Sequence, residues 1–477
     1  MLKKFIPIIV TLIAIAILIP IYLFIIQPAL DDATDDTPSV GSHGEMLSNQ
    51  GRPFIINPMD ESQLNTIKVT NASGGFEFFR AADGEIYLRG AEQHLYNTEL
   101  QKQLYTNTAT YLLAMEKLEQ HDELSTYGLS AENLSAVVEI TDESGNYYRL
   151  IIGDKLATGG GYYVMLDGRD AVYVVDTMLE QSVFCSAKDY IFPLMVPAIS
   201  QNDYYSISSF SLKKNGEQFV DIEKMTAEEE SQSVIYGQYK MTYPTNYTPS
   251  AENMTIILQS FIEFTADKVL DYDIDEEKLA YYGFKTGMKY EINYSYNGVN
   301  YVLYFSGKTH NGTYYVYSPL FDLIGEISES KLPFLEWDLI KFVDRNIFMI
   351  NIDNIASIDI TYPNGSATFA LTGEKEALSV TLNGSKVDTQ NFRYFYKSLL
   401  SIVIDGYEAM PESIPPSMTL QLTTHNNQVM NFDFYEVGSL KAFFTLNGKG
   451  EFYVHRDHLR TVISNLSKLA SGEKIEA

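Results

Sequence analysis

The most apolar part of the chain lies at its N-terminus, where hydrophobic residues run almost without interruption from Phe5 to Ile26. Counting from 5 to 26 gives 22 residues, which as a helix would span about 33 Å, close to the hydrocarbon core of a bilayer. Lys3 and Lys4 precede this run, and a group of aspartates follows it. The pattern predicts a single-pass membrane helix with its N-terminus inside and the bulk of the chain outside the cytoplasm.

A cleaved signal peptide is the alternative interpretation of the same segment. The apolar run is longer than the usual core of a signal peptide, and Gln27–Leu30 makes a poor small-x-small cleavage site. No cysteine stands directly after the run, where a lipoprotein signal needs one, so a lipoprotein signal is excluded. We therefore expect residues 1–27 to be a cytoplasmic stub and a retained anchor. Because only Met1–Lys4 would face the cytoplasm, any effect on the cell interior would have to pass through another membrane protein.

Beyond the anchor the chain first becomes polar and then becomes rich in strand-forming residues. Residues 28–62 are polar and rich in Asp, Pro, Ser and Gly without a sustained period, which predicts a flexible linker. From about Leu64 onward the chain is dense in Tyr, Ile, Val and Phe, and its 35 tyrosines are typical of half-buried antiparallel strands.

A weak internal repeat organises this β-rich part. Strand-like segments open three units, at Ile67–Thr70, Ser208–Leu212 and Ile358–Thr361. An amphipathic helix is predicted in each unit from apolar residues at helical spacing. These stripes are Leu104, Tyr111, Leu112, Met115 and Leu118 in the first unit, Met254, Ile257, Leu258, Phe261 and Ile262 in the second, and Phe392, Phe395, Tyr396, Leu399, Leu400 and Val403 in the third.

After the helix, the first two units share a tripeptide, Tyr127-Gly128-Leu129 and Tyr282-Gly283-Phe284. Alternating strands follow, and in the second unit they are separated by Asn297-Gly298, a strong hairpin signal. We expect each unit to close with an aromatic strand, at Tyr162–Val164, Tyr314–Val316 and Phe443–Thr445.

The repeat predicts an α+β fold in which about three antiparallel-sheet-plus-helix domains follow the transmembrane helix. We expect their boundaries at residues 63–195, 196–347 and 348–477. The third domain lacks the Tyr-Gly pair, so its match to the others is looser.

Composition and charge limit the classes of binding partner that can be expected. Hydrophobic residues make up 45% of the chain and charged residues 20%, which is ordinary for a folded protein. The net charge of −28 repels phosphate, so nucleic acid and anionic lipid headgroups are not expected as main partners. A lone cysteine, Cys185, excludes an internal disulfide framework.

These features together resemble a bacterial, membrane-anchored family of unknown function, number four-three-four-zero in the domain-of-unknown-function series. Besides the anchor, the residues that carry the resemblance are Tyr127–Leu129, Leu150–Gly153, and Tyr162–Val164 leading into Val172–Val175. The resemblance is best over about 65–180 and repeats more faintly to about 465. It implies an extracytoplasmic accessory role beside a gliding-motility-type ABC transporter, with permease and ATPase subunits as partners. The family offers no catalytic residues to transfer.

Two polar motifs invite a metal-site interpretation. His455-Arg456-Asp457-His458 places two imidazoles close together, but no zinc-protease pattern accompanies them, so a solvated strand-to-helix turn is expected. Asp271-Tyr272-Asp273-Ile274-Asp275 imitates the start of a calcium loop, yet Glu276 stands where that loop needs glycine and Tyr282 where it needs glutamate. We expect an acidic connector there, with weak calcium binding left open.

Three other features have simpler interpretations. Gly159-Gly160-Gly161 precedes a strand and lacks the Lys-Ser or Lys-Thr of a phosphate loop, so a hairpin tip is expected. Cys185 is expected to fill apolar space rather than act as a nucleophile. The tyrosine-rich sheets are compatible with a glycan or peptide surface, although cross-strand packing is the simpler explanation.

The sequence assigns no catalytic, cofactor-binding or metal-binding residue. The first functional hypothesis is a non-enzymatic, membrane-anchored scaffold that works with an ABC-type transporter. The second is a cell-surface module that binds envelope glycan, peptide or a cationic protein. An envelope enzyme with an unrecognised site is the third, since neither a metal set nor a nucleophile–base arrangement can be identified.

Overall fold

The computed structural model describes residues 40–232, 237–411 and 414–476. The predicted membrane run from Phe5 to Ile26 lies outside these residues, so membrane anchoring stays a prediction. Within the ranges described, no helix is both long enough and apolar enough to cross a bilayer.

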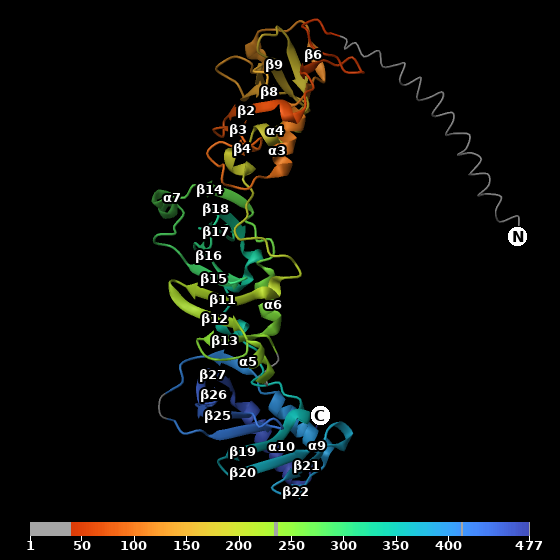
Figure 1. The fold of residues 1–477 in the computed structure, drawn as a ribbon. Coiled ribbons are helices and arrows are strands. Elements are labelled where there is room, and N and C mark those ends of the chain that lie inside the picture. The colour runs from red at the N-terminus through yellow and green to blue at the C-terminus, as the bar shows by residue number, and fades with distance from the viewer. Residues whose placement is uncertain (1–39, 233–236, 412–413, 477) are drawn as a thin grey trace, which may run out of the picture. The chain divides into compact units, whose positions relative to one another are not determined.

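Three large antiparallel sheets make up the fold (Figure 1). Contacts divide the chain into two compact units, with the boundary between Tyr190 and Ile191. The first unit holds one eight-stranded sheet, and the second unit holds one sheet of eight strands and one of nine. Repeated sheet domains are therefore confirmed, while the predicted boundaries at 63–195, 196–347 and 348–477 stay predictions.

The first sheet contains, in spatial order, β4 (Ile86–Leu88), β3 (Phe76–Arg80), β2 (Leu64–Asn71), β7 (Ala136–Asp142), β8 (Tyr147–Lys155), β9 (Tyr162–Leu166), β10 (Val172–Val175) and β6 (Glu116–Leu118). A two-stranded sheet pairs β1 (Phe54–Ile56) with β5 (Leu112–Leu113). Among residues 40–190, the helices of this unit are α3 (Thr98–Leu104), which continues as a π-helix over Tyr105–Ala109, and α4 (Glu180–Val183).

The second sheet contains, in spatial order, β13 (Tyr239–Tyr243), β12 (Glu217–Lys224), β11 (Ile207–Lys214), β15 (Tyr290–Tyr296), β16 (Val299–Phe305), β17 (Thr313–Ser318), β18 (Leu323–Ser328) and β14 (Lys268–Tyr272). Its helices are α5 (Ala227–Gln232), α6 (Ala251–Gln259), α7 (Glu276–Tyr281) and α8 (Leu339–Phe342).

The third sheet contains, in spatial order, β22 (Ser385–Lys386), β21 (Ser379–Leu382), β20 (Gly365–Thr372), β19 (Ile355–Tyr362), β24 (Met418–Thr424), β25 (Val429–Val437), β26 (Lys441–Leu446), β27 (Lys449–His455) and β23 (Ile404–Tyr407). Its helices are α9 (Thr389–Leu400) and α10 (Arg456–Ser471). The rings of Phe392 and Phe395 on α9 lie 5.1 and 5.2 Å from the ring of Phe369 on β20, so this helix packs on one face of the sheet.

All three sheets follow one plan. The chain makes three neighbouring strands (four in the third sheet), a helix, and then a short strand that becomes the far edge of the sheet. Four further strands fill the space between, and the last of them pairs antiparallel with the edge strand. These closing pairs are β10 with β6, β18 with β14 and β27 with β23. The prediction that each unit closes with its aromatic strand is therefore wrong, because β9, β17 and β26 each have another strand beyond them.

The predicted hairpins are confirmed. Asn297 and Gly298 adopt φ angles of 51° and 77°, as a two-residue hairpin turn requires, and Tyr296 faces Val299 across it. In the first sheet, Tyr147 on β8 faces Thr141 on β7, with Ser144-Gly145-Asn146 in the connection.

The predicted helices are confirmed only in part. In the second and third units α6 and α9 form where expected, although Phe261, Ile262 and Val403 lie beyond their ends. The first stripe is wrong beyond Ala109, where the π-helix that continues α3 ends, so that Tyr111, Leu112, Met115 and Leu118 lie outside the helix. Two later members of that stripe, Leu112 and Leu118, belong instead to strands β5 and β6.

The shared Tyr-Gly pair marks the same structure in both units. Gly128 and Gly283 take φ angles of 67° and 84°, a left-handed conformation that ends a short helical segment at low cost for glycine. Tyr127 packs edge-on against Tyr163 of β9 at 4.9 Å, and Tyr282 packs in the same way on Tyr315 of β17 at 5.5 Å. The turn is thereby fixed to the aromatic strand of its own sheet.

The N-terminal segment departs from the sequence prediction. Residues 40–62, assigned to the flexible linker 28–62, are packed onto the first sheet, and Ile55 and Ile56 of β1 are fully buried. The predicted linker therefore does not extend to residue 62. Pairing of β1 with β5, which polarity alone does not reveal, orders this part of the chain.

A buried carboxylate ties this segment to the closing strand pair. Glu45 is 0% exposed, and its Oε1 lies 2.7 Å from the Lys117 ammonium on β6 and accepts a 2.7 Å hydrogen bond from the Tyr173 hydroxyl on β10. Lys117 and Tyr173 are direct partners across the β6–β10 pair. Burial by itself raises the pKa of Glu45, but the hydrogen bonds from Lys117, Tyr173 and the backbone outweigh it and lower the pKa to about 2.

We expect Gly153→Ala to destabilise the first unit. A Cβ atom at Gly153 would lie 2.2 Å from the carbonyl oxygen of Tyr127, so the free energy of unfolding should fall by about 1–3 kcal/mol. Gly160→Ala is the matched control, because the nearest heavy atom to its Cβ would be 3.9 Å away. Urea denaturation followed by far-UV circular dichroism measures both. Equal midpoints for the two variants would show that β8 does not approach the Tyr-Gly turn.

The Glu45 pair predicts a stability change at acidic pH. Because folding lowers the pKa of Glu45 from 4.5 to about 2, its ionised form stabilises the fold above pH 4.5. This contribution should be lost as the pH falls from 4.5 to about 2. Denaturation at several pH values measures this loss, and Glu45→Gln should remove this pH dependence.

A charge deletion tests the same pair at neutral pH. Lys117→Met leaves a buried, unpaired carboxylate and should cost about 3–5 kcal/mol of unfolding free energy. Lys155→Met provides the control, because it breaks the half-exposed pair with Glu180, for which about 0–1 kcal/mol is expected. Equal losses for the two lysine variants would contradict a special role for Glu45.

Candidate functional site

The first of the two motifs with possible metal ligands forms a turn between a strand and a helix. His455 ends β27, and its imidazole accepts a hydrogen bond from the Asp457 N–H at the start of α10. His458 lies in the first turn of this helix, and burial lowers the pKa of its imidazole. The motif is thus the strand-to-helix turn that was predicted. Across the residues that are described, no group of three or more His, Cys, Asp or Glu side chains is arranged to hold a metal ion.

The acidic segment around Asp271 joins a strand to a helix. Asp271 belongs to β14 and forms a 3.0 Å ion pair with Lys278. Asp275 caps α7 by accepting a hydrogen bond from the Lys278 N–H. The predicted acidic connector is therefore confirmed, although its first two residues are part of the sheet.

The glycine run and the cysteine also have structural roles. Gly159-Gly160-Gly161 forms the connection between β8 and β9, as predicted for a hairpin tip. Cys185 is half-buried beside the Ser182 carbonyl, and burial raises the pKa of its thiol to about 11. A thiol with a raised pKa carries little thiolate at neutral pH and is a poor nucleophile.

Tyrosines contribute mainly to packing within the sheets. Tyr294 stacks on Tyr301 at 5.2 Å, and Tyr304 stacks on Tyr317 at 6.1 Å, both as cross-strand neighbours. A smaller group remains exposed, and Tyr205 is among its members at 45% exposure. This tyrosine lines a candidate site in the second unit.

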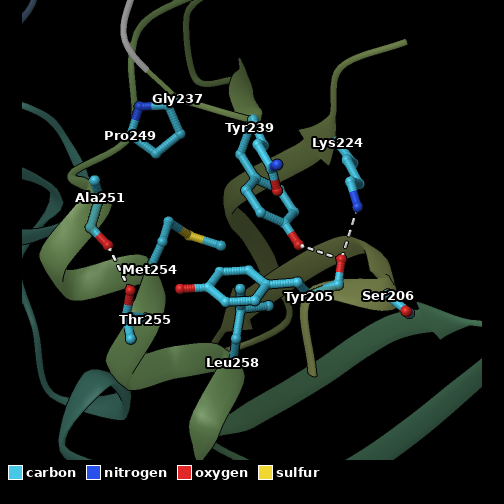
Figure 2. A pocket seen from close by; sticks show the side chains of 11 residues that line it. Tyr205, Ser206, Lys224, Gly237, Tyr239, Pro249, Ala251, Met254, Thr255 and Leu258 are labelled. Carbon is cyan, nitrogen blue, oxygen red and sulfur yellow. Dashed lines mark hydrogen bonds between the residues drawn. The ribbon is translucent and has the colours of Figure 1, made fainter. Parts of the chain in front are cut away.

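That site is an open cleft of about 470 Å³ beside helix α6 and the start of edge strand β13 (Figure 2). We call it the α6 cleft and define it by the lining residues Tyr205, Lys224, Tyr239, Met254, Thr255 and Leu258. Helix α6 begins at the Ser250 cap, whose hydroxyl accepts a hydrogen bond from the Asn253 N–H. The spacing of Met254 and Leu258, four residues apart, places both on the inner side of the helix.

The floor of the cleft is apolar and its rim is polar. Tyr239, Met254 and Leu258 are exposed by only 7%, 4% and 1% and form the floor. Thr255 lies on the exposed side of α6, where its hydroxyl donates to the Ala251 carbonyl at 2.9 Å. Clefts of this size, with an apolar lining and few polar groups, are typical ligand sites.

Two donors converge on one carbonyl at the cleft's edge (Figure 2). The Lys224 ammonium donates to the Tyr205 carbonyl oxygen at 2.8 Å, and the Tyr239 hydroxyl lies 3.3 Å from the same oxygen. The Tyr239 hydroxyl also donates to the Ile207 carbonyl at 2.8 Å, and burial raises its pKa to about 12. Both side chains are therefore held in place before any ligand arrives. The ammonium of Lys224 has two further protons, which suit a carboxylate or carbonyl of a ligand.

The sequence alone does not reveal this cleft. Met254 and Leu258 belong to the predicted helical stripe, and Thr255 lies on the same helix. The other lining residues come from β12, β13 and the turn before β11, which are separated along the chain. A pattern search within one segment cannot detect such a site.

We expect the two sides of α6 to respond differently to truncation. Leu258→Ala removes a floor residue that is 1% exposed and should lower the unfolding free energy of the second unit by about 2–5 kcal/mol. Ile256→Ala, on the same helix but 37% exposed, should cost less than about 1 kcal/mol. The only tryptophan, Trp337, lies in this unit, so its fluorescence during urea denaturation measures both. Equal costs would contradict the cleft floor described above.

Comparison with known proteins gives a match to one family model over part of the chain. No curated protein and no solved structure matches the chain. The family match extends from just before α3 of the first sheet to just after α7 of the second, a stretch that contains the α6 cleft. It confirms the resemblance inferred from the Tyr-Gly turns and the aromatic strands: residues 94–287 of this chain match the family model described as Domain of unknown function (DUF4340).

Proposed function

We propose that this chain is a non-enzymatic, membrane-anchored scaffold outside the cytoplasm that works beside an ABC-type transporter. The observation that carries the proposal is the repetition of nearly the same strand order in three sheets of a single chain. Tandem domains with the same backbone plan offer several surfaces on a common support, which suits a protein that holds partners. The open α6 cleft provides one such surface.

The N-terminal region supports the anchoring part of the proposal. Residues 27–39 separate the apolar run from Val40, and at roughly 3.5 Å per residue they reach no further than about 45 Å. From Val40 onward the chain is packed on the first sheet, with Glu45 held by Lys117 and Tyr173. An anchored chain would therefore keep its first sheet near the membrane, within reach of a membrane partner.

The transporter part rests on the family resemblance and on the predicted topology. The predicted topology places the described sheets outside the cytoplasm, so coupling to the cell interior would require another membrane protein. An ABC permease would cross the membrane beside this protein, and its ATPase subunit would supply the energy for transport. The scaffold would contact the permease from outside the cytoplasm.

A cell-surface binding module is the second candidate, and the α6 cleft favours it. Its apolar floor suits a hydrophobic side chain, and the Lys224 ammonium suits a nearby carbonyl or carboxylate. Among the ligands considered for a module of this kind, a peptide segment fits this combination of groups best.

In-cell crosslinking of the full-length protein tests both candidates. A photo-crosslinking amino acid is placed at Tyr205 in the cleft, and at Tyr281 in a control variant, because Tyr281 is 81% exposed and does not line the cleft. After mild detergent extraction, the crosslinked partners are identified by mass spectrometry. We expect an ABC permease and its ATPase to be enriched with the protein, and a specific partner to be crosslinked from Tyr205 rather than Tyr281.

A control transporter complex that survives the same extraction establishes that the conditions are mild enough. Recovery of the protein without any transporter subunit would then contradict the scaffold role. A partner crosslinked from Tyr205 alone, without a transporter, would instead support the binding module. Equal crosslinking from both positions would contradict a specific role for the cleft.

A further inference from the structure

The backbone of Tyr239 faces away from its own sheet beside the α6 cleft. Tyr239 belongs to β13, an edge strand of the second sheet. Gln238 accepts a hydrogen bond from the Met225 N–H on the inner side of β13, while Met241 exchanges two hydrogen bonds with Tyr247 on the outer side. Backbone groups alternate in direction along a strand, so the N–H and C=O of Tyr239 point outward, as those of Met241 do.

These two backbone groups have no strand to pair with. Pro249, two residues beyond Tyr247, is the residue that would face Tyr239, but proline has no N–H, and Pro249 forms a bridge with Val343 instead. In the part of the chain that the structure describes, the outward N–H and C=O of Tyr239 form no hydrogen bond. An open strand edge of this kind can pair with another extended segment.

The open edge belongs to the α6 cleft. Gly237 and Pro249 line the cleft together with Tyr239, so the cleft reaches the outer side of β13. Figure 2 shows Gly237 and Pro249 at one end of the cleft and Leu258 at the other. A chain that paired with Tyr239 would therefore have the apolar floor of the cleft next to it.

Lys224 adds a positive charge to the same place. It is the direct partner of Tyr239 across β12 and β13, so both side chains lie on one face of the sheet. Its half-buried ammonium is held by the Tyr205 carbonyl but, within the described residues, forms no ion pair. The next lysine on β13, Lys240, has a carboxylate partner in Glu229 at 2.5 Å. In a chain with a net charge of −28, Lys224 is thus a cation without its own anion.

We propose that the α6 cleft binds the carboxyl-terminal end of an extended peptide, which adds to β13 as a strand. One ligand residue exchanges hydrogen bonds with the N–H and C=O of Tyr239. The terminal carboxylate binds the Lys224 ammonium, and an apolar last side chain packs on Met254 and Leu258. Paired residues of neighbouring strands are about 5 Å apart, so one or two ligand residues, at about 3.3 Å each, span the distance.

The inference rests on the binding-module candidate described above and specifies the peptide that its cleft would take. Other ligands use fewer of the available groups. A fatty acid would use Lys224 and the apolar floor but not the backbone of Tyr239. An internal peptide segment would pair with Tyr239 but would bring no terminal carboxylate to Lys224. A charge-assisted hydrogen bond to that carboxylate is stronger than one to a neutral carbonyl.

Fluorescence anisotropy of the full-length protein in lipid nanodiscs tests the proposal. The probes are three dye-labelled peptide pools with five randomised positions and a final Leu, Val or Phe that carries a free carboxylate. The same pools with a terminal amide are the matched control. We expect saturable binding of at least one acid pool and about tenfold or more weaker binding of its amide, because the amide loses the charge-assisted hydrogen bond. Equal binding of acid and amide, or no binding of any acid pool, would overturn the proposal.

Backbone methylation of the ligand tests the added strand without changing the protein. A peptide selected from the best pool is made with an N-methyl group at each of its last three residues in turn. Only alternate residues of a strand donate to one neighbour, so affinity should fall about tenfold at alternate positions and change little between them. Unchanged affinity at all three positions would contradict strand addition.

Two lysine variants locate the terminal carboxylate. Lys224→Met should weaken binding of the acid peptide by about tenfold or more and leave binding of the amide unchanged. Lys289→Met is the control, because Lys289 is exposed, lies outside the cleft and, in the described residues, also forms no ion pair. It should change affinity by less than about twofold. Trp337 fluorescence during urea denaturation confirms that both variants are folded. Equal affinities for the two variants would overturn the assignment of the carboxylate to Lys224.

The result can be separated from that of the crosslinking experiment. A partner crosslinked from Tyr205, together with equal binding of acid and amide pools, would support a cleft that binds proteins and would overturn recognition of a chain end. Decanoate serves as a further probe, because it has a carboxylate and an apolar body but no peptide backbone. Binding of decanoate without binding of any acid pool would overturn the proposal in favour of a small amphipathic acid.

Discussion

Each sheet depends on one long-range strand pairing, which completes the sheet at one of its edges. In every repeat, the short strand after the helix pairs with the last strand, so the residues between them complete the sheet. Closing such a loop costs chain entropy, which the contacts across the pair must offset. In the first repeat Lys117 and Tyr173, which face each other in this pair, also hold Glu45. Cross-strand contacts also support the other two pairs, Lys268 with Glu326 at 2.7 Å and Tyr407 with Phe452 at 5.3 Å.

The three sheets share nearly the same strand order, but their surfaces differ. The first sheet uses its closing pair to hold the segment after the predicted anchor, and the second forms a cleft beside α6. These differences arise from side chains and loops, while the order of strands is kept. This combination of a shared strand order with different surfaces is the basis of the scaffold proposal.

Local patterns predicted the parts of the fold that local forces determine. Alternating residues and Asn297-Gly298 gave the hairpins, because turn geometry and strand period are encoded within a few residues. The stripe from Leu104 to Leu118 was wrong beyond Ala109, since the helical spacing of apolar residues persists past the end of the helix into residues that pair as strands β5 and β6. Short strands such as β6 carry too few residues to show a period.

Tertiary contacts account for what the sequence could not predict. Glu45 lies in a polar stretch, and only its meeting with Lys117 and Tyr173 reveals it as a buried carboxylate. The α6 cleft assembles residues from separate strands and a helix, so its chemistry appears only once the register is known. The repeat can be recognised in the sequence because the three units preserve the pattern of strand residues. The surfaces cannot be recognised there, because their residues differ between the units.

The central claim is that each sheet is completed at one edge by the pairing of a short early strand with the last strand. Hydrogen exchange of the full-length protein, read by mass spectrometry over β6, β14 and β23, tests it most directly. The account predicts that these edge strands exchange as slowly as β10, β18 and β27, with which they pair. Exchange at the rate of the connecting loops would contradict stable pairing at this edge.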